Sequence, residues 1–192
     1  MLRRIFSHIA AFLAAFLLAG ACLYAAEGSA VWLDVPFVKQ EKNACGAASV
    51  AMVMQFWQHQ QGLLPNADAD EARIQLALYS SKAHGIYASD LQNYFHHHGY
   101  QAFAFQGRRE DLRQHLEKGR PLIAALKPAP GAPLHYVVVV GFDAENGLVL
   151  LNDPAERKLM KQELASFEKE WKGAGYWTLL AVPQSGKASS AP

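Results

Sequence analysis

The fold is decided by the stretch Gln40-Glu41-Lys42-Asn43-Ala44-Cys45-Gly46-Ala47-Ala48-Ser49, which runs directly into the largely apolar residues 50–57. Apolar residues on every side of a helical repeat indicate a helix buried at the centre of a domain, here over residues 45–58. Because Cys45 begins this helix, unpaired backbone N–H groups and the positive end of the helix dipole favour its thiolate. The pattern indicates a nucleophile, although a buried structural thiol would give the same pattern.

Two neighbours of Cys45 suit acyl transfer. Gly46 follows the cysteine, and its missing side chain leaves room for a substrate backbone to approach. Gln40 lies five residues upstream, where its side-chain amide can donate to an oxygen that becomes negative during the reaction. We therefore predict that Gln40 is an oxyanion donor; the alternative is that it satisfies backbone groups where the helix begins.

The first 26 residues differ in kind from the rest of the chain. Two arginines, an almost wholly apolar run over residues 5–18 and the small residues Ala19-Gly20-Ala21 are typical of a secretory signal. Cleavage after Ala21, lipidation at Cys22 as in a lipoprotein, and cleavage near residues 25–26 are alternative outcomes. An uncleaved anchor is a further alternative, but the apolar run is short for a membrane span. We expect a periplasmic or secreted protein, membrane-attached if Cys22 is lipidated.

Export restricts what the two cysteines of the sequence can do. With Cys22 in or beside the signal, Cys45 is the one thiol expected in the folded domain and has no disulfide partner there. A lone thiol in an oxidising compartment is exposed to oxidation, and Val, Ala or Ser would fill the same space without that hazard. Catalysis therefore explains Cys45 better than packing does.

Charge and histidine content argue against other classes of protein. The chain has 18 Lys and Arg against 17 Asp and Glu, without a basic stripe, so we do not expect nucleic acid as a partner. The run His96-His97-His98 does not predict a metal site, because consecutive helical residues point about 100° apart. We expect neither a metal nor a cofactor.

A second element with chemical character lies near residue 135. The β-branched run 134–142 predicts a strand, Asn146-Gly147 predicts a hairpin turn, and residues 148–154 return antiparallel. This pairing sets His135 beside Asp153, which is the arrangement of a general base and the acid that orients it. Taken separately, the two residues are better explained as an edge histidine and a turn residue before Pro154, whereas together with the lone Cys45 they favour a catalytic pair.

The remaining patterns predict an α+β domain over residues 31–183, followed by a disordered tail over residues 184–192. Its helices would pack on an antiparallel sheet that carries His135 and Asp153. Further helices are predicted over 66–81, 90–98, 108–118 and 159–172, and further strands over 31–38, 100–105, 121–127 and 176–182.

In its order of motifs the chain resembles the C39 peptidases, which are papain-like domains that cleave double-glycine leader peptides. The resemblance rests on Gln40 with Cys45-Gly46-Ala47-Ala48, on residues 135–141 and on Asn152-Asp153-Pro154, and the segment 112–123 is similar as well. It implies a papain-like cysteine peptidase fold. It also implies a nucleophile at Cys45, a general base at His135, an orienting acid at Asp153 and an oxyanion donor at Gln40.

The chain departs from the best-known members of that family, which are cytoplasmic domains fused to ATP-driven transporters. Here an export signal takes the place of the transporter, and no ATP-binding domain is expected in this chain. We expect an exported cysteine peptidase that cleaves a secreted or periplasmic protein through a thioester, after a Gly-Gly-like or small-residue site. The alternatives are another acyl transfer or amide hydrolysis at the same site, or a non-catalytic binding or chaperone protein.

Overall fold

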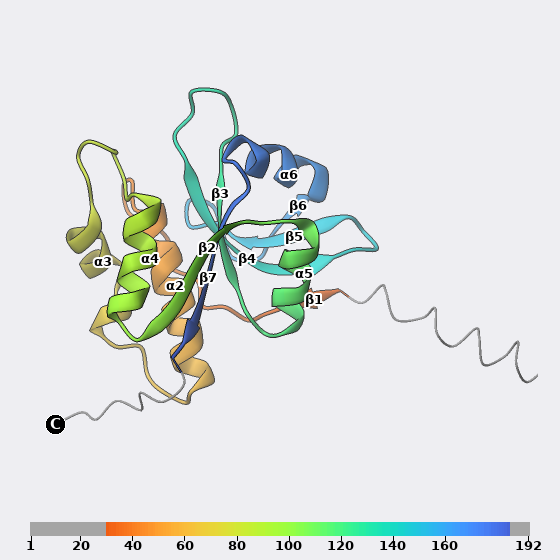
Figure 1. The fold of residues 1–192 in the computed structure, drawn as a ribbon. Coiled ribbons are helices and arrows are strands. Elements are labelled where there is room, and N and C mark those ends of the chain that lie inside the picture. The colour runs from red at the N-terminus through yellow and green to blue at the C-terminus, as the bar shows by residue number, and fades with distance from the viewer. Residues whose placement is uncertain (1–29, 185–192) are drawn as a thin grey trace, which may run out of the picture.

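The computed structural model describes residues 30–184, which form one antiparallel sheet with helices on both faces (Figure 1). The strand order is β2-β7-β3-β4-β5-β6, and β1 pairs with β4 beyond the end of β3. The strands are β1 (Val31–Trp32), β2 (Tyr100–Gln106), β3 (Leu122–Leu126), β4 (His135–Asp143), β5 (Leu148–Asn152), β6 (Met160–Glu163) and β7 (Trp177–Pro183).

The helices divide between the two faces of the sheet, as Figure 1 shows. The cysteine helix α2, with α3 and α4, covers one face, and α5 and α6 cover the other. A 3₁₀ helix, η1 (Ala67–Ala69), lies between α2 and α3. The helices are α2 (Cys45–Gln60), α3 (Glu71–Leu78), α4 (Ala88–His97), α5 (Arg109–Glu117) and α6 (Leu164–Gly173).

Strand β4 connects the two halves of the core because its side chains alternate between the faces. Tyr136, Val138 and Val140 pack with α2 and α4, whereas Val137 and Val139 pack with α5 and α6. A strand buried on both faces reads as a continuous apolar run, as this one does. The α+β class and the packing of the cysteine helix on an antiparallel sheet are thus confirmed.

The spacing of residues 159–172 predicted one helix, and this prediction is wrong. Leu159 has a φ of 53°, a left-handed conformation that an α-helix cannot contain. Residues 160–163 then pair with β5 as the edge strand β6, and α6 begins only at Leu164. Sheet pairing outweighed helical periodicity in this segment.

The helix predicted over residues 66–81 is also interrupted. Asn66 caps the short η1, and Asp70 caps α3 by accepting a hydrogen bond from the backbone N–H of Arg73 at 3.0 Å. A side chain that caps a helix holds its own backbone outside the helix, so a second cap starts a second helix. Helix α3 is therefore much shorter than predicted.

The strand predicted over residues 31–38 is mostly absent. Only β1 pairs with β4, opposite Gly141 and Phe142, and residues 33–44 cross the sheet end as an irregular segment. We call residues 33–40 the strap. Pro36 has no N–H to donate to a sheet ladder, which is consistent with a segment held by other bonds.

The expected signal over residues 1–26, including Cys22, lies outside the described residues, as does the tail beyond Gln184. Within residues 30–184, the helices are all too short or too polar to cross a bilayer.

Candidate active site

Cys45 is the first residue of α2 and is half-buried, as a free thiol. The preceding residue, Ala44, offers no side chain to cap the helix, so the N–H groups of the first turn have no capping partner. One residue earlier, Asn43 has a φ of 60°, a conformation that non-glycine residues adopt at some energetic cost. The chain thus turns sharply to present Cys45 at an open helix N-terminus.

The side chains of His135 and Asp153 meet as the hairpin pattern predicted. Nε2 of His135 lies 2.7 Å from Oδ1 of Asp153. The register of β4 and β5 pairs Val138 with Asn152, so Asp153 leaves the end of β5 on the side of His135. Oδ1 of Asp153 also accepts a hydrogen bond from the backbone N–H of Ala155 at 2.9 Å. A backbone hydrogen bond therefore holds the carboxylate in position independently of its contact with the imidazole.

The histidine also interacts with the cysteine. Because Nε2 faces Asp153, Nδ1 is the ring nitrogen that remains for the thiol of Cys45. Burial alone would lower the pKa of His135, but hydrogen bonds to Asp153 and Cys45, and their negative charges, outweigh it and raise that pKa to about 10. The imidazole is thereby favoured as a cation beside the carboxylate of Asp153.

Asp153 shows the opposite balance. Burial would raise the pKa of its carboxyl group, but the hydrogen bond and positive charge of His135, with backbone N–H donors, lower it from the ordinary value. The carboxyl group stays ionised although its residue is only 7% exposed. A buried carboxylate that faces an imidazolium can orient it and stabilise its charge.

Gln40 reaches the same end of the sheet through its backbone. Its N–H donates to the carbonyl oxygen of Pro154 at 2.9 Å, which ties the strap to the residue after Asp153. Its side-chain oxygen Oε1 is buried and has no hydrogen-bond partner among residues 30–184. An unpaired buried acceptor costs free energy, and Oε1 cannot itself donate to an oxyanion, so the role of Gln40 as an oxyanion donor stays a prediction.

Sequence reasoning assigned no role to the side chain of Asn152, which holds the strap from the other side. Its Nδ2 donates to the carbonyl oxygens of Val35 at 3.1 Å and of Pro36 at 3.4 Å, and its Oδ1 accepts from the N–H of Leu159 at 3.0 Å. The side chain is fully buried. The sequence signal that could have predicted this role is an amide side chain at the end of an apolar strand, because a buried amide must find hydrogen-bond partners.

The interpretation of Gly46 was wrong. A Cβ at this position would lie 3.2 Å from Leu91 Cδ2 and 3.4 Å from both Ile86 Cβ and Tyr136 Cδ2. Gly46 is needed for the close packing of α2 on α4 and β4, and the space beside it is filled by the core rather than open to a substrate.

Of the histidine run at the end of α4, His98 has a structural role, whereas His96 and His97 are exposed. The ring of His98 stacks on Tyr94 with centroids 4.0 Å apart, and its Nδ1 lies 2.8 Å from the Tyr94 carbonyl oxygen. Across residues 30–184, no three His, Cys, Asp or Glu side chains gather in a way that could hold a metal ion.

Three solved structures with similar folds are described as peptidases or peptidase domains. A C39-like peptidase from Bacillus anthracis superposes with a TM-score of 0.64 at 18% identity, covering 82% of this chain and 99% of that one. A double glycine motif protease from an AMS/PCAT transporter, in complex with its leader peptide, gives 0.60 at 23% identity and covers 80% and 95%. The peptidase domain of Streptococcus ComA, a bifunctional ABC transporter, gives 0.59 at 19% identity and covers 78% and 98%.

Sequence comparison with curated proteins finds no match. The model of the Peptidase_C39 like family matches residues 32–178, which include the strap, the cysteine helix and the hairpin with His135 and Asp153. This match spans most of the chain. The protein is therefore a member of the Peptidase_C39 like family.

Proposed function

We propose that this protein is an exported cysteine peptidase in which Cys45 is the nucleophile, His135 the general base and acid, Asp153 the orienting acid and Gln40 an oxyanion donor. The observation that carries the proposal is the chain of contacts from Asp153 through His135 to Cys45 at an open helix N-terminus. Family membership and the fold of the similar structures support a peptidase-type function.

Acylation follows from the positions of these groups. The thiolate of Cys45 attacks the scissile carbonyl carbon, and the carbonyl π electrons move onto its oxygen, which becomes an oxyanion. The side-chain amide of Gln40 and the backbone N–H groups at the start of α2 donate to this oxyanion. Collapse of the intermediate breaks the C–N bond, and Nδ1 of His135 protonates the departing amine. The product is a thioester on Cys45.

Deacylation uses the same groups in the opposite order. His135, now neutral, takes a proton from water, and the resulting hydroxide attacks the thioester carbonyl carbon. The second oxyanion collapses, the C–S bond breaks, and the carboxylic acid product leaves. The thiolate and the imidazolium are regenerated as the pair that began the cycle, with Asp153 holding the ring throughout.

The compartment and the substrate follow from different observations. The arginines and apolar run of residues 1–21 support export, so the substrate is a protein or peptide outside the inner membrane. One similar structure is a double glycine motif protease bound to a leader peptide, which supports cleavage after a Gly-Gly or similar small-residue site.

The experiment that tests the function compares exported proteins from cells that express the wild-type chain or the Cys45→Ala variant. New N-termini are identified by mass spectrometry. Termini that follow small residues and occur only with the wild type support the proposal. Their equal abundance in both strains, with the variant folded and exported, would contradict it.

A further inference from the structure

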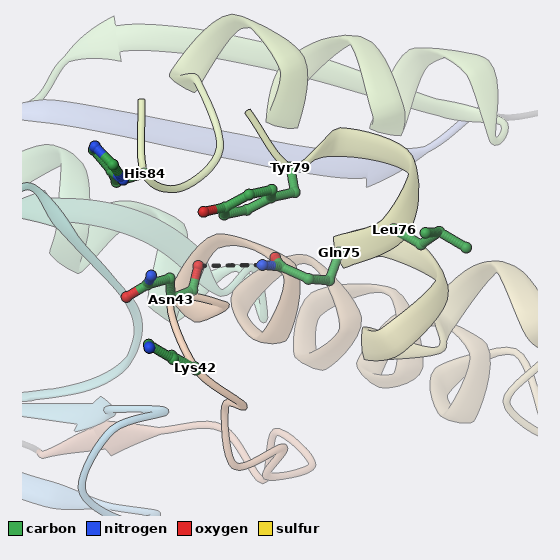
Figure 2. A pocket seen from close by; sticks show the side chains of 6 residues that line it. All are labelled: Lys42, Asn43, Gln75, Leu76, Tyr79 and His84. Carbon is green, nitrogen blue, oxygen red and sulfur yellow. Dashed lines mark hydrogen bonds between the residues drawn. The ribbon is translucent and has the colours of Figure 1, made fainter. Parts of the chain in front are cut away.

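A polar pocket of about 600 Å³ opens beside the loop that precedes Cys45 (Figure 2). Three segments contribute to it: the loop before α2, helix α3, and the turn after α3. In the view of Figure 2, Tyr79 and His84 lie on one side of a hydrogen bond from Gln75 to the Asn43 carbonyl, and Lys42 lies on the other. The lining residues are Lys42, Asn43, Gln75, Leu76, Tyr79 and His84.

The pocket lies within reach of a substrate bound at Cys45. Consecutive Cα atoms are about 3.8 Å apart, so the Cα of Asn43 is at most about 7.6 Å from that of Cys45. An extended substrate advances about 3.3–3.6 Å per residue. A side chain within about three residues of the scissile bond can therefore span the distance from Cys45 to Asn43.

Backbone and side-chain hydrogen bonds hold the walls of the pocket in place. Nε2 of Gln75 donates to the carbonyl oxygen of Asn43 at 3.4 Å, which joins α3 to the loop before the cysteine. The turn that carries His84 is closed by the bond from the N–H of Ser80 to the carbonyl oxygen of Gly85 at 2.8 Å. His84 itself has a left-handed φ of 50°. A binding surface held in this way is formed before a ligand arrives.

The chemistry of the pocket suits an anionic group. No Asp or Glu lines it, whereas Lys42 is a cation and His84 a hydrogen-bond donor. Neither residue takes part in an ion pair within residues 30–184. Oε1 of Gln75 is buried and has no hydrogen-bond partner among residues 30–184.

We propose that this pocket is a specificity subsite, in which Lys42 binds an acidic side chain of the substrate close to the scissile bond. The proposal rests on the peptidase function proposed above and adds a charge preference to it. Two acidic residues, Glu41 and Glu71, lie nearby but do not line the pocket. The backbone N–H of Glu41 donates to Oε1 of Glu71 at 3.5 Å.

The test uses short peptides that contain a central Gly-Gly. Each peptide carries Asp, Asn or Lys at one of the three positions before or after the Gly-Gly, and the peptides compete for the enzyme in one reaction. Relative kcat/KM values are read by mass spectrometry for the wild type and for Lys42→Glu. The matched control is Lys82→Glu, which makes the same charge change in the His84 turn outside the pocket lining. Ratios between peptides cancel any general effect of a variant on Cys45.

We expect the wild type to prefer Asp over Lys at one position by about two- to fivefold, the range for exposed charge pairs. Lys42→Glu should reverse this preference, and Lys82→Glu should retain it. Cleavage without a charge preference, or a preference that survives Lys42→Glu, would overturn the subsite and leave the peptidase intact. Failure to cleave any peptide would instead contradict the peptidase function on which the subsite depends.

Discussion

The backbone N–H of Gln40 donates to the carbonyl oxygen of Pro154 at 2.9 Å, so the proposed oxyanion donor is fixed to the residue that follows the proposed orienting acid. These residues are far apart in the sequence and come together because the strap crosses the end of the sheet at β5. Oε1 of Gln40 has no hydrogen-bond partner among residues 30–184 in this arrangement. Nε2 of the same amide is the atom that would donate to an oxyanion.

Replacement of Gln40 tests this role. If the amide donates mainly in the transition state, Gln40→Ala should lower kcat by about 10²–10³-fold and leave substrate binding nearly unchanged. Gln40→Glu should be at least as damaging, because it places a negative charge where another must develop. Steady-state kinetics on folded variants measure this. If both variants melt at lower temperature with unchanged kcat, Gln40 has only a structural role.

Replacement of His135 and replacement of Asp153 should lower kcat by different factors. His135→Ala should lower kcat by about 10²–10⁴-fold, because it removes the group that transfers protons. Asp153→Asn should cost less, because an amide can still hold the ring in part. Single-turnover assays of folded variants give the comparison. Equal or reversed losses would show that the two roles are assigned incorrectly.

The strap depends on the buried amide of Asn152. Asn152→Ala leaves the carbonyl oxygen of Val35 and the N–H of Leu159 without this partner, and we expect it to lower the free energy of unfolding by about 1–3 kcal/mol. Asn146→Ala is a matched control, because Asn146 bonds to Asp143 in the exposed hairpin turn. It should cost less than about 0.5 kcal/mol. Similar losses in urea denaturation would contradict the role of Asn152.

Stability should depend on pH through His135. Its pKa rises from 6.5 to about 10 on folding, so the folded state binds more protons than the unfolded state between these values. The stabilisation by the ion pair is complete below about pH 6.5 and is lost as pH rises towards 10, by less than about 1.4 kcal/mol per pH unit. In the Cys45→Ala background, where no thiol titrates, urea midpoints between pH 6 and 10 should fall more steeply with His135 present than with His135→Gln. Parallel curves would contradict the raised pKa.

The proximity of His135 and Asp153 was predictable because an Asn-Gly turn between two apolar runs defines a hairpin, and a hairpin brings its outer ends together. The helix at Cys45 was predictable for a similar reason, since its signal is local. The α+β class followed from these two elements and from the order of the remaining patterns.

The features that depend on distant contacts were not predictable. The pattern of residues 159–172 is helical, yet pairing with β5 makes its first part a strand. Gly46 looked like an opening for substrate, and only the packed structure shows Leu91 and Tyr136 filling that space. The bonds of Asn152 to the strap join residues more than a hundred positions apart, which no local pattern reports.

The central claim is that His135 holds Cys45 as a reactive thiolate, and the rate of alkylation of Cys45 by iodoacetamide at pH 6 tests it most directly. At that pH only about 0.3% of an ordinary cysteine is thiolate. Labelling is assigned to Cys45 by peptide mass spectrometry, for the wild type and for folded His135→Ala. We predict that the wild type reacts at least about tenfold faster, because the imidazolium stabilises the thiolate; equal rates in the two proteins would contradict the account.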